Sequence, residues 1–261
     1  MKIAILGAAG RMGQNLIRCG VKTPGCEITA AVERPDFPGL GQPVREESLP
    51  APLAYTAEWP AGADAVIDFT FHTAVSENLS RAIANGQAYV LGTTGLTEEE
   101  QEKVFGAARQ IPVVWAPNMS TGVNLLLELV RRSAEILGSD YDIEIVETHH
   151  RLKKDAPSGT AIGLAQAAAA GRKVALKEVA CYGREGIVGE RPVGEIGIHA
   201  LRGGSVVGDH TVHFMANEER IELTHRASSR EAFAKGAIRA ALWLEGKKPG
   251  LYNMRHVLGF E

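Results

Sequence analysis

The chain has 261 residues, of which 45% are hydrophobic, so it can bury a full core in one large domain or two modest ones. Its formal net charge of −3 argues against a nucleic-acid-binding protein, which is normally basic. The three scattered cysteines form no C-x-x-C pair, and no apolar run reaches membrane-spanning length, so we expect a cytoplasmic protein with free thiols and no membrane segment.

The first part of the chain alternates short apolar runs with helical patterns. The runs lie at 2–6, 26–33, 64–69, 88–91 and 111–115, and helices are expected at 73–85 and 97–109. Thr97 and Glu100 have the spacing of a capping box at the start of the second of these helices. Such alternation predicts a Rossmann-type doubly wound α/β domain over residues 1–120, with a parallel sheet covered on both faces.

The pattern changes after residue 120. A long helical segment leads to YDIEIVET, in which Ile and Val alternate with acidic residues as in a half-exposed strand. An alanine-rich helix is expected at about 158–170, and strand-like runs follow at 174–180, 194–202, 205–215 and 219–227, the last two joined by a turn at ANEE. These features predict a second, α+β domain with a mixed sheet over 121–229. The amphipathic C-terminal segment, 230–261, is expected to return to the first domain.

The turn GAAGRMG stands between the first apolar run and a helix. Gly7, Gly10 and Gly13 would let the backbone approach a pyrophosphate closely, and the helix N-terminus would favour its negative charge. The spacing differs from G-x-G-x-x-G because Ala9 stands at the middle glycine. An ordinary glycine turn is the alternative interpretation.

Glu33 ends the second apolar run, about 20 residues beyond the glycine turn, as in dinucleotide-binding domains. There an acidic side chain can accept hydrogen bonds from both ribose hydroxyls of the adenosine half. Arg34 could instead neutralise the 2′-phosphate of NADP, with Arg11 as a second cation. The pair therefore predicts that both cofactors are accepted, while a solvated strand end remains the alternative.

Three small or polar turns follow predicted parallel strands: DFT at 68–70, GTTG at 92–95 and APNMS at 116–120. Loops at the carboxyl ends of such strands line the ligand crevice. Each alone could be an ordinary turn, but together they lie on the edge where a nicotinamide would bind. Gly92, Thr93 and Thr94 are the best candidates to contact it.

The segment ETHHRLKKDAPSGTA, residues 147–161, brings two histidines and several cations directly before a helix start. Either Asp155 or Ser158 can cap that helix, and Gly159 and Thr160 lie in its first turn. Since helix N-termini bind anions, the segment predicts a site for a multiply charged carboxylate, with a histidine that exchanges a proton. A solvated basic face is the alternative.

Other chemistries fit the sequence less well. The histidines of HTVH, 210–213, would point to opposite faces of a strand, so no metal site is expected. Ser158 lacks the G-x-S-x-G elbow of a hydrolase nucleophile.

The motifs GAAGRMG, IDFT, GTTG, APN and above all E-x-HH-R-x-K-x-DAPSGTA resemble the 4-hydroxy-tetrahydrodipicolinate reductase family, also called dihydrodipicolinate reductase. The resemblance runs from residue 2 to about 258. It implies a two-domain homotetramer that reduces 4-hydroxy-tetrahydrodipicolinate to tetrahydrodipicolinate, with loss of water, in lysine and diaminopimelate biosynthesis. The substrate would be a small cyclic imine with two carboxylates, and the cofactor NADH, NADPH or both.

The resemblance also implies roles for individual residues. His149 would donate and accept the proton, Lys153 would be a second proton donor, and His150, Gly159 and Thr160 would bind the carboxylates. The implied cofactor contacts are Gly7, Ala8, Ala9, Gly10, Arg11, Met12, Glu33, Arg34, Gly92, Thr93, Thr94, Ala116, Pro117, Asn118 and Met119. Two alternatives stay open: another two-domain NAD(P)-dependent amino-acid or imine dehydrogenase, and a non-catalytic NAD(H)-sensing module.

Overall fold

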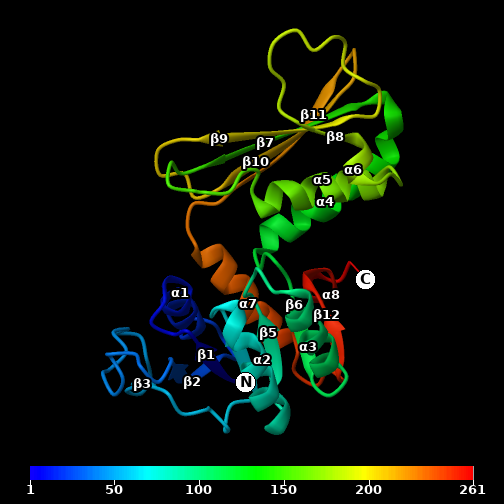
Figure 1. Cartoon of the computed structure of the whole chain (residues 1–261). Coiled ribbons are helices and arrows are strands. Elements are labelled where there is room, and N and C mark those ends of the chain that lie inside the picture. Colours follow the sequence, from blue (N-terminus) through cyan, green and yellow to red (C-terminus); the bar gives the residue numbers. More distant parts are fainter. Residues whose placement is uncertain (261) are drawn as a thin grey trace. The chain divides into compact units, whose positions relative to one another are not determined.

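The computed structural model describes residues 1–260. The chain forms two compact units (Figure 1), one made of Met1–Thr121 with Arg230–Glu261 and the other of Gly122–Ser229. The first unit therefore takes its residues from both ends of the chain, and the second is one continuous segment.

The first unit is built on a seven-stranded parallel sheet in the order β12-β6-β5-β4-β1-β2-β3. From β1 the chain moves outward in both directions, so the carboxyl ends of β1 and β4 lie side by side at the point where the strand order reverses. The strands are β1 (Lys2–Leu6), β2 (Glu27–Val32), β3 (Tyr55–Thr56), β4 (Ala65–Asp68), β5 (Ala88–Leu91), β6 (Pro112–Trp115) and β12 (Gly250–Tyr252). The helices are α1 (Arg11–Gly20), α2 (His72–Ala84), α3 (Glu98–Ala108), α7 (Glu231–Trp243) and α8 (Met254–Leu258).

Both faces of this sheet are buried, which explains why its strands are near-continuous apolar runs. In β1, Ile3 and Ile5 join a core that includes residues of α1, α7 and α8, whereas Ala4 and Leu6 join a second core that includes residues of α2 and α3. Alternate residues of one strand thus face opposite helix layers. The predicted doubly wound fold is confirmed.

The C-terminal helix α7 belongs to this unit and packs against α1. Gly236 of α7 allows a close approach, since a Cβ added there would lie only 1.7 Å from the carbonyl oxygen of Met119. The turn after β6 therefore rests directly on the backbone of α7.

The second unit contains a mixed five-stranded sheet in the order β11-β10-β7-β9-β8. Strands β7, β8 and β9 are parallel, and β10 and β11 run antiparallel to their neighbours. The strands are β7 (Asp142–His149), β8 (Ala180–Tyr182), β9 (Ile196–Arg202), β10 (Asp209–Met215) and β11 (Arg220–Arg226). Its helical elements are α4 (Thr121–Leu137), the 3-10 turn η1 (Gly138–Asp140), α5 (Gly159–Gly171) and α6 (Leu176–Val179). The predicted mixed sheet is confirmed.

One expected strand is wrong. Within the run 174–180, Leu176–Val179 forms the short helix α6, and the strand begins only at Ala180. Leu176 and Val179, three residues apart, both pack against the core of the second unit, a spacing that suits one face of a helix. The capping box of Thr97 and Glu100 is present as predicted, and β10 and β11 form the expected hairpin.

Candidate active site

The glycine turn after β1 leads into an unusually open helix start. Gly7 has a φ of +68°, and a Cβ at Gly13 would lie 2.3 Å from the Gly7 carbonyl oxygen, so both positions need glycine. Gly10 is the N-cap of α1 and supplies no side-chain cap, and the first turn of α1 carries no acidic residue. The N-terminal N–H groups of α1 can therefore donate hydrogen bonds to an anion such as the pyrophosphate of a dinucleotide.

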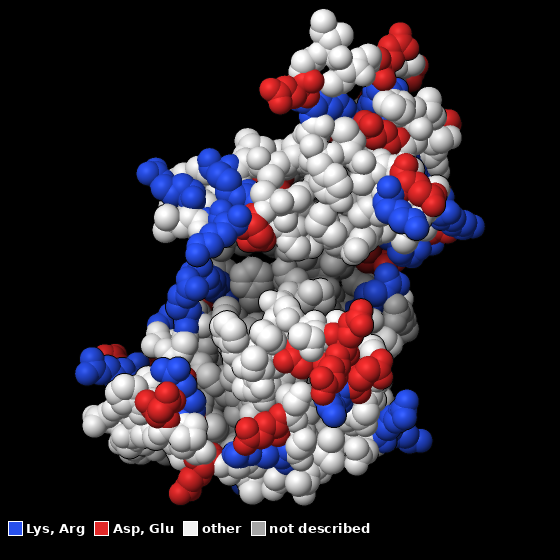
Figure 2. Space-filling view, viewed as in Figure 1, with Lys and Arg blue, Asp and Glu red and all other residues white. Residues whose placement is uncertain are grey.

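Helix α3 shows the opposite arrangement. Its first turn contains Glu98, Glu99 and Glu100, and Thr97 completes a capping box with Glu100. Figure 2 shows acidic side chains gathered over this helix. Because its own carboxylates satisfy the N-terminus of α3, an external anion would be repelled there. The contrast supports α1 as the anion site of this unit.

Glu33, directly after β2, lies beside the glycine turn. Its Oε1 accepts a hydrogen bond from the backbone N–H of Ala9 at 2.8 Å. Arg34 does not join it, since its guanidinium pairs with Asp36 at 3.1 Å and both side chains are exposed. The structure thus places Glu33, the expected acceptor for the ribose, at the glycine turn. A 2′-phosphate would have to compete with Asp36 for the guanidinium of Arg34.

The expected nicotinamide residues gather around two cavities at the carboxyl edge of the sheet. Met12, Phe69 and Gly92 line both of them. The first, about 220 Å³, is completed by Pro117, Asn118, Met119, Arg230 and Phe233. The second, about 520 Å³, is completed by Arg11, Thr70, Phe71, His72, Thr93 and Thr94.

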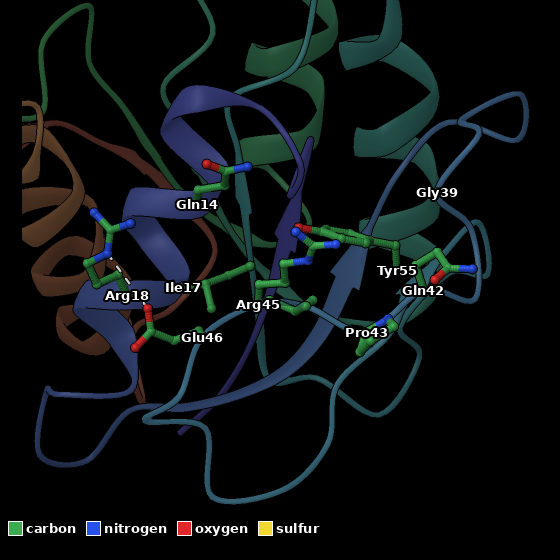
Figure 3. A pocket seen from close by; sticks show the side chains of 10 residues that line it. Gln14, Ile17, Arg18, Gly39, Gln42, Pro43, Arg45, Glu46 and Tyr55 are labelled. Atoms are coloured by element: carbon green, nitrogen blue, oxygen red, sulfur yellow. Dashed lines mark ion pairs between the residues drawn. The ribbon is translucent and has the colours of Figure 1, made fainter.

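Two of the expected cofactor residues lie behind this edge. Ala8 and Ala116 are buried, and their N–H groups bond to the carbonyl oxygens of Val32 and Leu91, respectively. They hold the turns in place from the core. A separate cavity of about 430 Å³, between α1 and the segment leading to Tyr55, is lined by none of the expected residues (Figure 3).

In the second unit, His149 ends β7 and stands two residues after Glu147, so both side chains lie on the same, buried face of the strand. The Nδ1 of His149 lies 2.5 Å from Oε2 of Glu147. Arg202, on the neighbouring strand β9, donates to both oxygens of the same carboxylate at 2.9 Å. The N–H of Ser158 donates to it at 3.0 Å.

These contacts determine the charge of Glu147. Burial opposes ionisation, but the hydrogen bonds from Arg202, His149 and the backbone of Ser158 outweigh it and lower the pKa of the Glu147 carboxyl. An ionised carboxylate only accepts, so Nδ1 of His149 carries the hydrogen of their bond. Nε2 of His149 is therefore the nitrogen that can exchange a proton with a substrate.

The surroundings of His149 leave little free space. A Cβ added to Gly208 would lie 3.0 Å from its Nε2. The ring of His210 contacts the ring of His149 edge to face, with centroids 5.2 Å apart, and its Nε2 lies 3.0 Å from Oγ of Ser158. Burial and the neighbouring His149 lower the pKa of His210 to about 4, so His210 is neutral at physiological pH.

The other expected substrate residues lie around the start of α5. Ser158 caps this helix by accepting from the N–H of Ala161, so Ser158 and not Asp155 is the cap. Gly159 and Thr160 begin the helix, whose first turn contains no acidic residue. Lys153 pairs with Asp155 at 2.9 Å.

His150 turns its backbone N–H to the carbonyl oxygen of Val206 at 2.8 Å. This bond ties the loop after β7 to the loop after β9. The Nδ1 atom of the His150 ring is buried and has no hydrogen-bond partner within residues 1–260. A buried polar atom without a partner is costly, and a hydrogen bond to a bound ligand would satisfy it.

The sequence-based expectations include no role for Glu147, Arg202 or His210, nor for Arg230 and Phe233 at the sheet edge. Asp68 and Phe69 belong to the DFT turn expected to line the crevice, but without individual roles. The spacing of Glu147 and His149 is a signal that could have been used, because residues i and i+2 of a strand share a face. Arg202 and His210 come from distant strands, and nothing local marks them. Within residues 1–260, no group of His, Cys, Asp and Glu has the arrangement of a metal site, and no helix could span a membrane.

Two family models together match almost the whole chain. Residues 1–119 match the family described as dihydrodipicolinate reductase, N-terminus, and residues 122–258 match its C-terminus. A 4-hydroxy-tetrahydrodipicolinate reductase of Anaeromyxobacter dehalogenans is 50% identical over 263 residues, with 99% of this chain and 97% of the relative covered. One of Magnetococcus marinus is 48% identical over 266 residues, with 100% and 99% covered.

A solved structure of dihydrodipicolinate reductase from Paenisporosarcina sp. TG-14, described as dipicolinate-bound, has the same fold, with a TM-score of 0.77 at 24% identity and 97% of each chain covered. The resemblance seen in the motifs is thereby confirmed. The chain belongs to the dihydrodipicolinate reductase family.

Proposed function

We propose that His149 is the proton donor of a reductase reaction, oriented by Glu147, and that the first unit binds the nicotinamide cofactor. The single observation that carries this proposal is the buried pair of Glu147 and His149 beside the start of α5. It combines a fixed imidazole with a helix N-terminus that can accept an anion.

The reaction follows from the family. Relatives about half identical to this chain over its whole length are 4-hydroxy-tetrahydrodipicolinate reductases. The chain is accordingly an NAD(P)H-dependent oxidoreductase of lysine and diaminopimelate biosynthesis, which reduces 4-hydroxy-tetrahydrodipicolinate to tetrahydrodipicolinate with loss of water. When bound, the reduced cofactor supplies the hydride.

The residues of the second unit divide the remaining work. Glu147 keeps the hydrogen on Nδ1 of His149, so that Nε2 can deliver a proton to the reduced ring. Arg202 neutralises the charge of Glu147. The pair of Glu147 and His149 would therefore not repel a substrate that carries two carboxylates. Gly159 and Thr160, at the N-terminus of α5, and His150 would bind the substrate carboxylates.

Lys153 is the second candidate proton donor. Its ammonium pairs with Asp155, and this pairing lowers the pKa of Asp155. A substrate carboxylate would compete with Asp155 for the ammonium. Lys153 can therefore act on the substrate by exchanging one carboxylate partner for another.

In the first unit, Gly7, Gly10 and the start of α1 would hold the pyrophosphate, and Glu33 would accept from the adenosine ribose. Gly92, Thr93, Thr94 and the turn at 116–119 would surround the nicotinamide. Met12 and Phe69, which line both cavities, would exclude water from it.

We further propose a cytoplasmic homotetramer. The described cysteines are all free thiols, which suits a reducing compartment. The tetramer rests on the family resemblance alone. Light scattering of the purified protein tests it, and a monomeric mass at micromolar concentration would contradict it.

The reaction is tested by following NADH absorbance at 340 nm while the imine is generated enzymatically from its precursors. We expect oxidation of NADH that depends on this protein and is inhibited by pyridine-2,6-dicarboxylate. NADH binding without oxidation would favour a sensing module, and turnover with amino acids instead would favour a different dehydrogenase.

A further inference from the structure

Asp68, the last residue of β4, has a fully buried side chain although no role in the reaction has been assigned to it. None of the ion pairs formed within residues 1–260 involves it. A buried carboxylate is stable only when its oxygens are fully hydrogen-bonded. The donors that surround Asp68 therefore reveal what it holds together.

Five donors converge on this carboxylate. Oδ1 accepts from the N–H of Thr70 at 2.8 Å, from its hydroxyl at 2.6 Å, and from the hydroxyl of Thr93 at 3.1 Å. Oδ2 accepts from Nδ2 of Asn78 at 2.9 Å and from the hydroxyl of Tyr89. The two oxygens thus serve different parts of the unit, since Oδ1 holds the loops after β4 and β5, whereas Oδ2 faces α2 and the buried strand β5.

The two loops held by Oδ1 are the ones that line the larger cavity at the sheet edge. Phe69, Thr70, Gly92, Thr93 and Thr94 all contribute to that lining. The N–H of Gly92 also donates to the backbone oxygen of Asp68 at 2.9 Å. Asp68 therefore sets the separation of the two walls of the cavity.

The side chain of Thr93 shows that the contact is directed inward. Thr93 is only 4% exposed, and its hydroxyl bonds to Asp68. On the opposite wall, the ring of Phe69 lies so close that a Cβ added to Gly92 would be 2.2 Å from it. Because the Phe69 ring packs directly on the backbone of Gly92, a displacement of one loop must also displace the other.

We infer that Asp68 is a positioning residue, which fixes the two loops against which the nicotinamide is bound without touching the cofactor itself. The inference rests on the proposed cofactor role of Gly92, Thr93 and Thr94. Loosening the network should weaken NADH binding, and it should also slow hydride transfer, because a small displacement of the ring is costly to the reaction.

The chain offers a matched pair of substitutions on the same carboxylate. Thr93→Val removes the donor to Oδ1 that joins the two loops, whereas Tyr89→Phe removes a donor to Oδ2 in the core. Burial and the neighbouring Asp68 raise the pKa of Tyr89 well above its usual range, so this phenol is a donor throughout the accessible pH range. Thr93→Ser keeps the hydroxyl and serves as the conservative rescue.

The experiment measures NADH dissociation constants by quenching of tryptophan fluorescence, together with kcat, KM and Tm. Trp115 lines a neighbouring cavity together with Thr93, Thr94 and Pro117, so quenching of its fluorescence reports on this site. We expect Thr93→Val to raise Kd and KM for NADH roughly tenfold, the scale of one lost hydrogen bond to a charged acceptor. Thr93→Ser should return both to within about threefold of wild type.

Tyr89→Phe should lower Tm as Thr93→Val does but leave Kd for NADH within about twofold of wild type. Equal loss of NADH affinity in both variants, or none in Thr93→Val, would overturn the inference. Asp68→Asn should weaken NADH further if it folds, and the Thr93 pair decides the question if it does not. Absence of imine reduction by wild type would refute the proposed function, while the NADH affinities would still judge Asp68.

Discussion

The proton of His149 is controlled by one buried carboxylate. Because Glu147 binds Nδ1, only Nε2 is left to serve a substrate. If His149 is the proton donor, as proposed, replacement of the imidazole removes general acid catalysis. We expect His149→Gln to lower kcat by roughly 10² to 10⁴ with little change in KM. Steady-state kinetics with NADH check this. Lys154→Gln, a substitution at an exposed position of the same loop, should leave kcat and KM nearly unchanged. A fully active His149→Gln variant would show that another group supplies the proton.

Gly208 provides a second test at the residue scale. A methyl group there would lie 3.0 Å from Nε2 of His149 and should displace the imidazole from its working position. We expect Gly208→Ala to reduce kcat by roughly tenfold or more, since misplacement of a catalytic group by about 1 Å is that costly. Gly203→Ala is the matched control, because a Cβ there meets nothing within 4 Å. Equal kinetics for the two variants would mean that His149 works through another orientation.

Glu33 discriminates between the cofactors if its carboxylate receives the 2′-hydroxyl of NADH, which NADPH lacks. Glu33→Ala should therefore raise KM for NADH by roughly tenfold and leave KM for NADPH almost unchanged. Parallel measurements with both cofactors check this. An equal rise for both would show that Glu33 acts only by fixing the N–H of Ala9 in the glycine turn.

At the scale of elements, Glu144 and Glu147 of β7 lie on opposite faces of the strand and have different partners. Glu147 faces the helices and the site, and Glu144 faces the other side, where it binds Arg184, Arg191 and His199. Burial opposes its ionisation, but the hydrogen bonds of these three side chains lower the pKa of Glu144 from 4.5 to about 2. The Glu144 carboxylate therefore links β7 by hydrogen bonds to His199 of β9 and to Arg184 and Arg191, which lie between β8 and β9.

The pKa of Glu144 predicts how stability depends on pH. Because the folded value is lower than the unfolded value, its contribution is complete above about pH 4.5 and is lost as the pH falls toward 2. Glu144→Gln should cost about 1–3 kcal/mol of unfolding free energy at pH 7 and progressively less in acid. Urea unfolding at pH 7, 4 and 2.5 measures this. Glu222→Gln, on a more exposed strand, should have little effect, and a pH-independent loss for Glu144→Gln would contradict the argument.

At the scale of the whole molecule, each unit has its own hydrophobic core and its own helix with no acidic residue in the first turn, α1 in the first unit and α5 in the second. On the proposed function, α1 binds the cofactor and α5 binds the substrate. NADH alone should slow amide hydrogen exchange around residues 7–13 and 92–94, and pyridine-2,6-dicarboxylate alone should slow it around 149–160. Exchange monitored by mass spectrometry checks both. Protection of the glycine turn by the dicarboxylate, with none at 149–160, would reverse the assignment of the two units.

The parts of the fold predicted correctly are those with a local signal. Apolar runs of a few residues between helical patterns marked the parallel strands, and Thr97 with Glu100 marked the start of α3. The segment 174–180 was assigned wrongly because a short apolar run suits either a strand or one helical turn, and only packing of Leu176 and Val179 on the core decides between them.

The sequence by itself determined the doubly wound and mixed-sheet architecture, the glycine turn and the cationic segment at 147–161. Each of these features has a signal in residues that are close together along the chain. The tertiary structure alone decided that Arg202 neutralises Glu147, that Asp68 ties two loops together, and that Gly236 lets α7 touch the turn at Met119. These contacts join residues far apart along the chain. Hydrophobic periodicity records which face of an element is buried but not which distant side chain it meets there.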